Sequence, residues 1–141
     1  MRGGKHLLID RGNLFIFEKP MASFEEIIPI KEGIFETKSL TVVISLSDHQ
    51  IKPNYGFKSL WEEGLAFSLP NGNYYLAKAL ASMKFKGKLL DKLWNDRKVP
   101  AYFRDKIPAI FSEKGLEKEL LSGEREAFNG FFSILIKFKQ F

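Results

Sequence analysis

The side chains best suited to binding chemistry lie in one stretch, residues 84–108. This stretch holds eight basic residues against three acidic ones, a balance of +5, and the whole 141-residue chain also has a formal charge of +5. The rest of the chain, with 14 basic and 14 acidic residues, is therefore neutral. A charge excess confined to one segment favours a polyanionic partner such as nucleic acid.

Lysines alternate with other residues at the start of this stretch, K-F-K-G-K at 84–88. An extended backbone would direct their three ammonium groups to one side, and Lys92 continues that side one helical turn beyond Lys88. Such lysines can bind successive phosphates, each displacing a condensed counterion. The predicted RNA-binding residues are Lys84, Lys86, Lys88 and Lys92, with Lys98, Arg104 and Lys106 as weaker candidates.

The same stretch also allows a structural interpretation. A helix over 88–98 would carry three lysines and two aspartates on its polar side, a balance of only +1, as an ordinary surface helix does. Arg97 falls on the apolar side, where it could cap the helix end. Arg104 and Asp105 could form a local pair, and Phe85 is better suited to the core than to stacking on a base.

Other chemistries lack the residues they need. The chain has no cysteine, which excludes disulfides and thiolate metal sites. Its two histidines, His6 and His49, lie far apart, and no Gly-rich phosphate loop or G-x-S-x-G motif occurs. We therefore predict no catalytic residue, no metal and no cofactor in this chain.

The elements that would position these residues indicate an α+β domain: a β-rich fold of short antiparallel strands with two or three short helices. The 14 phenylalanines favour strands and a ring-packed core. Turn residues predict a hairpin over 7–17, with Gly12-Asn13 at its turn, and a second hairpin around the Pro-Asn-Gly-Asn block 70–73. Further strands are predicted at 40–46, 109–112 and 131–139.

Apolar periodicity predicts short helices over 57–64, where Gly64 would end the helix, and over 88–98. Pro100 would begin a third helix, 101–106. The residues predicted for the core of this region are Leu89, Leu90, Leu93, Trp94, Val99 and Ile107. We treat 1–141 as one domain, with a β-rich leading segment 1–52 and a helix-containing segment 53–141. No signal peptide or membrane span is evident, so we expect a cytoplasmic protein without a membrane partner.

An ordered set of motifs resembles the C-terminal domain of the tRNA(Ile)-lysidine synthetase family. A related domain occurs in the β subunit of phenylalanyl-tRNA synthetase. The matching parts are the basic Gly-containing lead-in at 86–88, the helix at 89–94, V-P at 99–100, R-D-K-I-P at 104–108, the apolar strand at 109–111 and the E-K-G turn at 113–115. Two departures are the lack of a G-D-R-x-x-P-like segment before the helix and Lys78 where the family commonly has Arg.

The resemblance implies that this chain is the C-terminal part of such an enzyme and holds the acceptor stem of isoleucine tRNA. It also implies a separate N-terminal catalytic domain that uses ATP and lysine to modify the wobble cytidine. That domain would carry an S-G-G-x-D-S loop, a motif that this sequence lacks. The alternative is a protein-interaction domain whose basic stretch docks on an acidic partner or on its own catalytic domain. A homodimer is left open.

Overall fold

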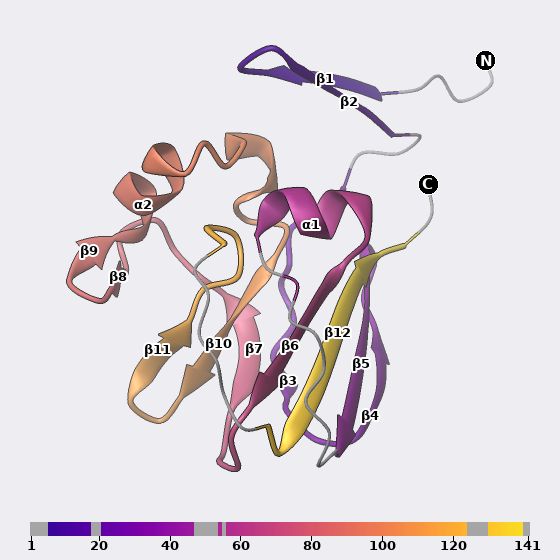
Figure 1. The fold of residues 1–141 in the computed structure, drawn as a ribbon, viewed down its shortest axis with the longest axis vertical. Coiled ribbons are helices and arrows are strands. Elements are labelled where there is room, and N and C mark those ends of the chain that lie inside the picture. Colours follow the sequence, from indigo (N-terminus) through magenta and orange to yellow (C-terminus); the bar gives the residue numbers. More distant parts are fainter. Residues whose placement is uncertain (1–5, 18–20, 47–53, 55, 124–129, 140–141) are drawn as a thin grey trace.

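The computed structural model describes residues 6–17, 21–46, 54, 56–123 and 130–139. The fold is β-rich α+β with antiparallel sheets and two α-helices, which confirms the predicted class (Figure 1). The elements are β1 (His6–Asp10), β2 (Asn13–Phe17), β3 (Ile28–Pro29), β4 (Gly33–Glu36), β5 (Leu40–Leu46), α1 (Phe57–Glu62), β6 (Leu65–Leu69), β7 (Tyr75–Lys78), β8 (Lys84–Phe85), β9 (Lys88–Leu89), α2 (Leu90–Asp96), the 3-10 helix η1 (Ala101–Phe103), β10 (Pro108–Ser112), β11 (Gly115–Lys118) and β12 (Phe132–Phe138).

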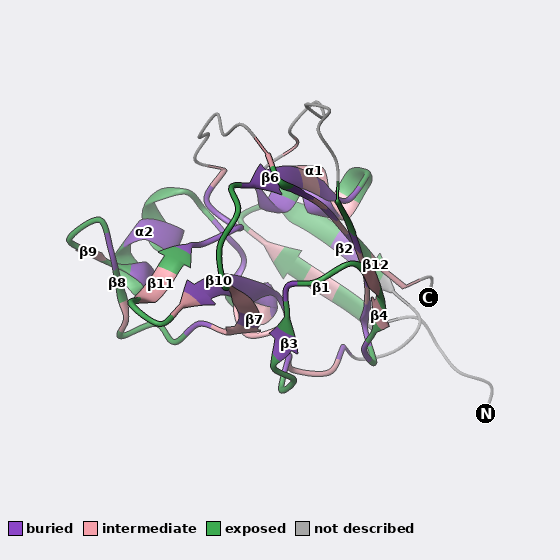
Figure 2. Cartoon of the chain, turned by 90° about the horizontal axis from the view of Figure 1, so that it is seen from below, coloured by how far each residue is buried: buried purple, intermediate pink, exposed green. Residues whose placement is uncertain are grey.

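Two four-stranded antiparallel sheets form the body of the molecule, in the orders β11-β10-β7-β3 and β4-β5-β12-β6. Both sheets combine strands from before and after residue 52. β12 pairs with β5 on one side and β6 on the other, and its alternating side chains Ile134 and Ile136 are fully buried. β6 and β10 are buried over most of their length (Figure 2). The predicted strands at 40–46, 109–112 and 131–139 are confirmed within one residue at each end.

The prediction of a hairpin around residues 70–73 is wrong. This segment turns the chain, but β6 pairs with β12 and β7 pairs with β10 and β3, so the turn connects two different sheets. A turn signal determines where the chain reverses, whereas strand pairing depends on which distant strand covers each edge.

The hairpin predicted over 7–17 is confirmed as β1–β2, with a different turn. Arg11 and Gly12 adopt positive φ angles of 49° and 84°, and Asn13 already pairs with Asp10. Two positive φ angles match the twist of a two-residue hairpin. On one face Phe15 is buried. The opposite face consists of two cross-strand pairs, each side chain 47–74% exposed, and we call it the apolar face: Leu7 with Ile16, and Ile9 with Leu14.

Aromatic rings join β2, α1 and η1, as the abundance of phenylalanine predicted. The Phe103 ring is fully buried, and its centroid lies 4.7 Å from Phe57, 5.5 Å from Phe15 and 5.5 Å from Trp61. α1 ends at Glu62, and Gly64 follows two residues later with φ at 102°, at the place predicted for the glycine that closes this helix. A Cβ there would approach Ile136 O to 2.9 Å, so glycine also allows the chain to pass close to β12.

α2 is shorter than the predicted helix 88–98, because Lys88 and Leu89 form β9. Leu90, Leu93 and Trp94 are buried as predicted, and so are Val99 and Ile107. Leu89 is 44% exposed and was wrongly predicted to be core, because it precedes the helix and leaves its apolar stripe. In the described part of the chain, no helix has the length and apolar character that crossing a membrane requires.

Candidate nucleic-acid interface

The lead-in 84–88 is a tight hairpin instead of an extended strand. Lys86 and Gly87 have φ angles of 53° and 81°, and the Cα pairs are Lys84 with Leu89 and Phe85 with Lys88. Residues opposite each other in an antiparallel pair share a face, and neighbours along a strand do not. Lys84 and Lys88 therefore lie on opposite faces, and the predicted alignment of three ammonium groups is wrong.

Phe85 belongs to the core, as predicted. It is 7% exposed and lies in the main hydrophobic cluster. The Lys86 ammonium lies 5.3 Å from the centroid of its ring, a cation–π distance. Phe85 thus anchors the β8–β9 hairpin in the core, and its ring is too buried to stack on a base.

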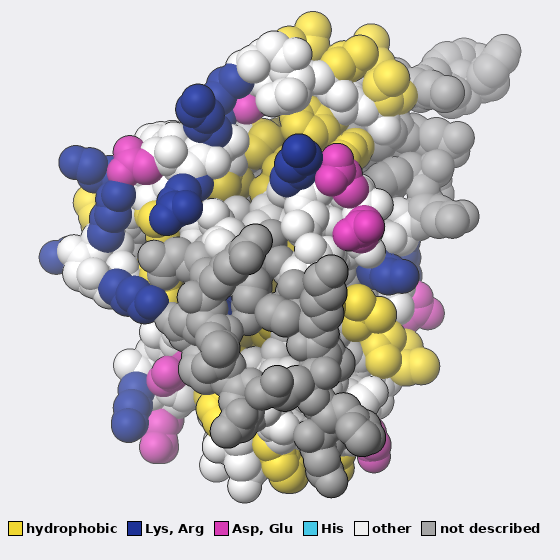
Figure 3. Space-filling view, viewed as in Figure 1, with side chains coloured by type: hydrophobic (Ala, Val, Ile, Leu, Met, Phe, Trp, Pro, Cys, Tyr) yellow, Lys and Arg dark blue, Asp and Glu magenta, His cyan; other side chains and the backbone are white. Residues whose placement is uncertain are grey.

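The charges of the stretch 84–108 divide into two groups. Each of its three aspartates contacts one basic side chain: Asp91 with Arg104, Asp96 with Lys88, and Asp105 with Lys106. The other five basic residues are all exposed and account for the whole excess of +5. We call them the basic surface: Lys84, Lys86, Lys92, Arg97 and Lys98. In Figure 3, Lys and Arg side chains gather in the region of α2 and the β8–β9 hairpin.

Lys88 is held by Asp96 at the far end of α2. Its ammonium donates to Asp96 Oδ2. This hydrogen bond and the positive charges of Lys88, Lys92 and Arg97 lower the pKa of the Asp96 carboxyl from its ordinary value. Lys88 is therefore partly neutralised within the protein.

Arg104 has a structural position. Its side chain is only 14% exposed, and its Nε and Nη2 groups donate to the Val99 carbonyl oxygen at 3.1 and 2.7 Å. Nη2 also donates to Asn95 Oδ1 at 2.9 Å, and Nη1 lies 3.4 Å from Asp91. The predicted local pair with Asp105 is not formed; the guanidinium instead fastens the Val99-Pro100 connection to α2.

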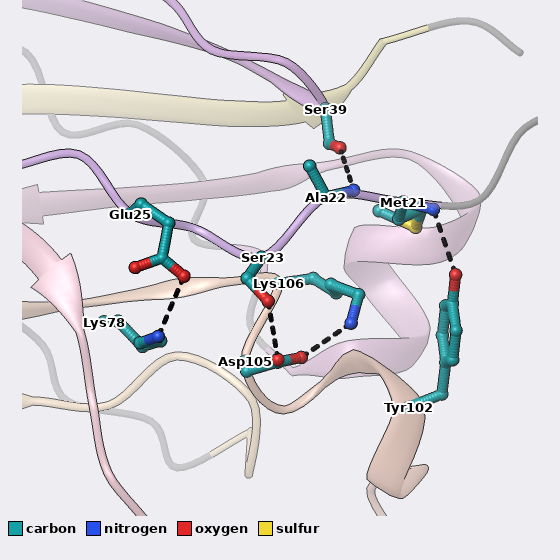
Figure 4. Close-up of polar contacts among 9 residues, drawn as sticks. All are labelled: Met21, Ala22, Ser23, Glu25, Ser39, Lys78, Tyr102, Asp105 and Lys106. Atoms are coloured by element: carbon teal, nitrogen blue, oxygen red, sulfur yellow. Dashed lines mark hydrogen bonds and ion pairs between the residues drawn. The ribbon is translucent and has the colours of Figure 1, made fainter.

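Lys106 and Asp105 connect the end of the η1 region to residues 21–25 (Figure 4). The Lys106 side chain is 12% exposed; its ammonium lies 2.8 Å from Asp105 Oδ1 and 4.5 Å from the Tyr102 ring centroid. Asp105 Oδ2 accepts from the Ser23 hydroxyl at 2.7 Å. Although partial burial acts in the opposite direction, the hydrogen bonds from Lys106 and Ser23 lower the pKa of Asp105.

The lowered pKa of Asp105 leads us to predict how the stability of the fold changes at acid pH. A carboxyl whose folded pKa lies below the unfolded value of about 3.9 stabilises the fold above that pH, and the contribution disappears as the pH falls through the folded pKa. We expect Asp105→Asn to lower the free energy of unfolding by about 1 kcal/mol at pH 7, since the carboxylate is half-exposed and partly screened.

Urea denaturation at pH 7 and pH 3 measures this effect. The difference between wild type and Asp105→Asn should be smaller at pH 3, because below the unfolded pKa the unfolded carboxyl takes up a proton and the stabilisation decreases. The exposed Glu113→Gln serves as a control and should change stability by less than about 0.5 kcal/mol at pH 7. A difference for Asp105→Asn that grows toward low pH would contradict the assignment.

A groove of about 660 Å³ adjoins the basic surface. It lies where β2, α1, the α2–η1 connection and residues 121–123 meet, and its lining includes Arg97 and Lys98 of the basic surface. Lys58 of α1 adds a third basic side chain, and Glu62 is the acidic one. The apolar lining residues are Leu14, Phe15, Phe57, Trp61, Pro100 and Leu121.

A buried carboxylate fixes one wall of this groove. Glu119 is 3% exposed, and its Oε1 accepts from Trp94 Nε1 at 3.1 Å and from the Leu121 and Ser122 amides at 3.0 and 2.9 Å. Its Oε2 accepts from the Ser122 hydroxyl. Glu119 thereby ties α2 to the turn that carries the lining residues Leu121 and Ser122.

Sequence reasoning missed three residues of this region. Arg97 was predicted on the apolar side of a long helix, where it could cap the helix end; α2 ends at Asp96 and Arg97 is its C-cap residue, but its side chain is exposed. The nearby Pro100 was a usable signal, because a helix must end before it. Lys58 in α1 and Glu119, directly after β11, are brought to the site only by the fold.

The described part of the chain contains no cluster of three His, Cys, Asp or Glu side chains able to hold a metal ion; His49 lies outside it. Comparisons with protein-family models, curated proteins and solved structures found no match to this chain. Fold and site thus define a β-rich α+β domain with a basic surface and an adjoining groove.

Proposed function

We propose that this chain is a tRNA-binding module whose basic surface holds the phosphates of the acceptor stem. The observation that carries the proposal is the position of the charge: the five exposed lysine and arginine side chains of the basic surface gather around α2 and the β8–β9 hairpin (Figure 3), and their number equals the net charge of the chain. Exposed ammonium and guanidinium groups are the usual partners of phosphate oxygens.

A double-stranded stem is the form of RNA that suits this surface. The major groove of A-form RNA is too narrow for side chains to read base edges, so stems are recognised by their shape and phosphates. Long, mobile lysines on a short hairpin and a helix end meet that requirement without base specificity. Lys88, Arg104 and Lys106 would act indirectly, by holding the elements that carry the basic surface.

The proposed biological setting follows from the motif resemblance at 86–115. In this setting the protein is cytoplasmic, and the chain positions isoleucine tRNA for a catalytic domain that uses ATP and lysine to modify the wobble cytidine. The chain contributes binding and no catalytic group.

The test is the salt dependence of tRNA binding. If all five side chains of the basic surface bind phosphates, a plot of log affinity against log salt should have a slope between about −4 and −5, at roughly −0.9 for each contact. Fluorescence anisotropy of labelled tRNA over a range of KCl concentrations measures the slope. Absence of binding at low salt, or a slope shallower than about −1, would contradict the proposal.

A second candidate, docking on a protein, is favoured by the apolar face of β1–β2. Four aliphatic side chains there are 47–74% exposed on one side of a hairpin, and contiguous apolar patches often mark contacts with other proteins. The proposed occupant is the catalytic domain implied by the motif resemblance. An electrophoretic shift assay separates the candidates, because docking alone predicts no shift of labelled tRNA at low salt.

A further inference from the structure

The groove is continuous with the basic surface. Arg97 and Lys98 belong to both, because they follow α2 directly and also line the groove. A polyanion held along α2 therefore meets the groove at the helix end. This continuity places any groove ligand next to the RNA of the proposed function, on which the inference below rests.

The groove lining combines positive charge with apolar surface. The lining includes three basic side chains and one acidic side chain, and this balance favours an anionic ligand. Its aliphatic and aromatic side chains favour a ligand with an apolar or planar part. A duplex stem offers phosphates but keeps its bases stacked inside. An unpaired nucleotide offers both a phosphate and a base that can leave the stack.

The size and rigidity of the groove also fit such a ligand. Its volume of about 660 Å³ lies within the range of roughly 300–1,000 Å³ for small-ligand sites, which allows about one or two nucleotides. The ring cluster of Phe15, Phe57, Trp61 and Phe103 supports the lining. Glu119 fixes the turn at 121–122. Little ordering would be needed on binding.

Lys98 has an unfavourable backbone conformation for its residue type. Its φ is 58°, and the amide of Val99 donates back to Trp94 O at 2.9 Å, so Lys98 lies at the left-handed position that ends a helix. Glycine is the residue usually found there, because it adopts positive φ without steric cost. A lysine at this position makes the backbone less stable than glycine would, and it places a charged side chain at the groove.

We propose that the groove binds unpaired nucleotides of a single-stranded RNA end that adjoins the stem held by the basic surface. Lys58, Arg97 and Lys98 bind the phosphates, and the apolar lining receives the base. The basic surface thus binds the duplex without regard to sequence, and the groove detects whether an unpaired end is present.

The test compares a blunt RNA stem with the same stem extended by four unpaired nucleotides at its 5′ or 3′ end, using fluorescence anisotropy at one salt concentration. For the wild type we expect one extended RNA to bind about tenfold more tightly than the blunt stem, because base stacking and added phosphate contacts strengthen its binding. Lys58→Glu should remove this preference and leave the affinity for the blunt stem unchanged.

Two further variants make the result specific. Lys98→Gly should reduce the preference while keeping or raising the midpoint of thermal unfolding, which separates loss of binding from loss of folding. Lys31→Glu has the same charge change as Lys58→Glu, lies outside the groove and should keep the preference. Equal wild-type affinity for blunt and extended stems overturns the groove proposal and leaves the proposed function standing. Binding of no RNA at low salt overturns both.

Discussion

Charge reversal at Lys84 and Lys92 is expected to weaken binding of tRNA by about 100-fold near 0.1 M salt. Each substitution to Glu removes a phosphate contact and introduces repulsion, so a loss of roughly 1.4 kcal/mol for each position is reasonable. Both side chains are exposed, and for neither does the structure record an ion pair within its described residues. The free energy of unfolding should therefore change by less than about 0.5 kcal/mol.

The salt dependence provides a second readout of the same double variant. Loss of two phosphate contacts should make the log–log slope shallower by about 1.8. The matched control is Lys31→Glu with Lys38→Glu, which changes the net charge equally at exposed positions next to β4. Equal weakening by the control pair would show that only net charge matters and would contradict the basic surface.

Substitution of Glu119 by Ala should lower the free energy of unfolding by about 3 kcal/mol. The buried carboxylate accepts hydrogen bonds from Trp94, from the Leu121 amide and from both the amide and the hydroxyl of Ser122. Alanine would leave these donors without an acceptor, at about 1–3 kcal/mol for each buried unsatisfied group, partly offset by removal of a buried charge.

Thermal unfolding measures this loss. For a domain of this size the midpoint of unfolding should fall by roughly 10 °C. Glu119→Gln retains an acceptor oxygen and should be clearly less destabilising, and the exposed Glu113→Ala should have almost no effect. A Glu119→Ala protein as stable as the Glu113→Ala protein would show that these hydrogen bonds do not hold the turn.

Local residue preferences account for the elements that sequence reasoning predicted correctly. Examples are the β1–β2 reversal, the end of α1 just before Gly64 and the buried side of α2. Each of them depends on residues that are close together in the sequence. Positive φ angles and apolar periodicity are properties of such short windows. The position of the charge excess in 84–108 is likewise a property of the sequence alone.

The predictions that failed concern relations between residues or elements. Lys84, Lys86 and Lys88 were expected on one side, but a two-residue turn at Lys86-Gly87 places Lys84 and Lys88 on opposite faces. Apolar runs on either side of 70–73 look like a hairpin, although each strand pairs elsewhere. In both cases the outcome depended on the pairing register, which the residue types did not reveal.

Only the tertiary structure decided which charges contact one another and which lie exposed. Asp91 meets Arg104, 13 residues away, and Ser23 meets Asp105 across 82 residues of sequence. Lys58 reaches the same groove as Arg97 and Lys98 because packed rings join α1 to η1 and β2. The sequence by itself determined that this protein has a basic segment and a β-rich, ring-packed core. The fold determined which five cations face outward and that a groove lies beside them, because these depend on contacts between distant segments.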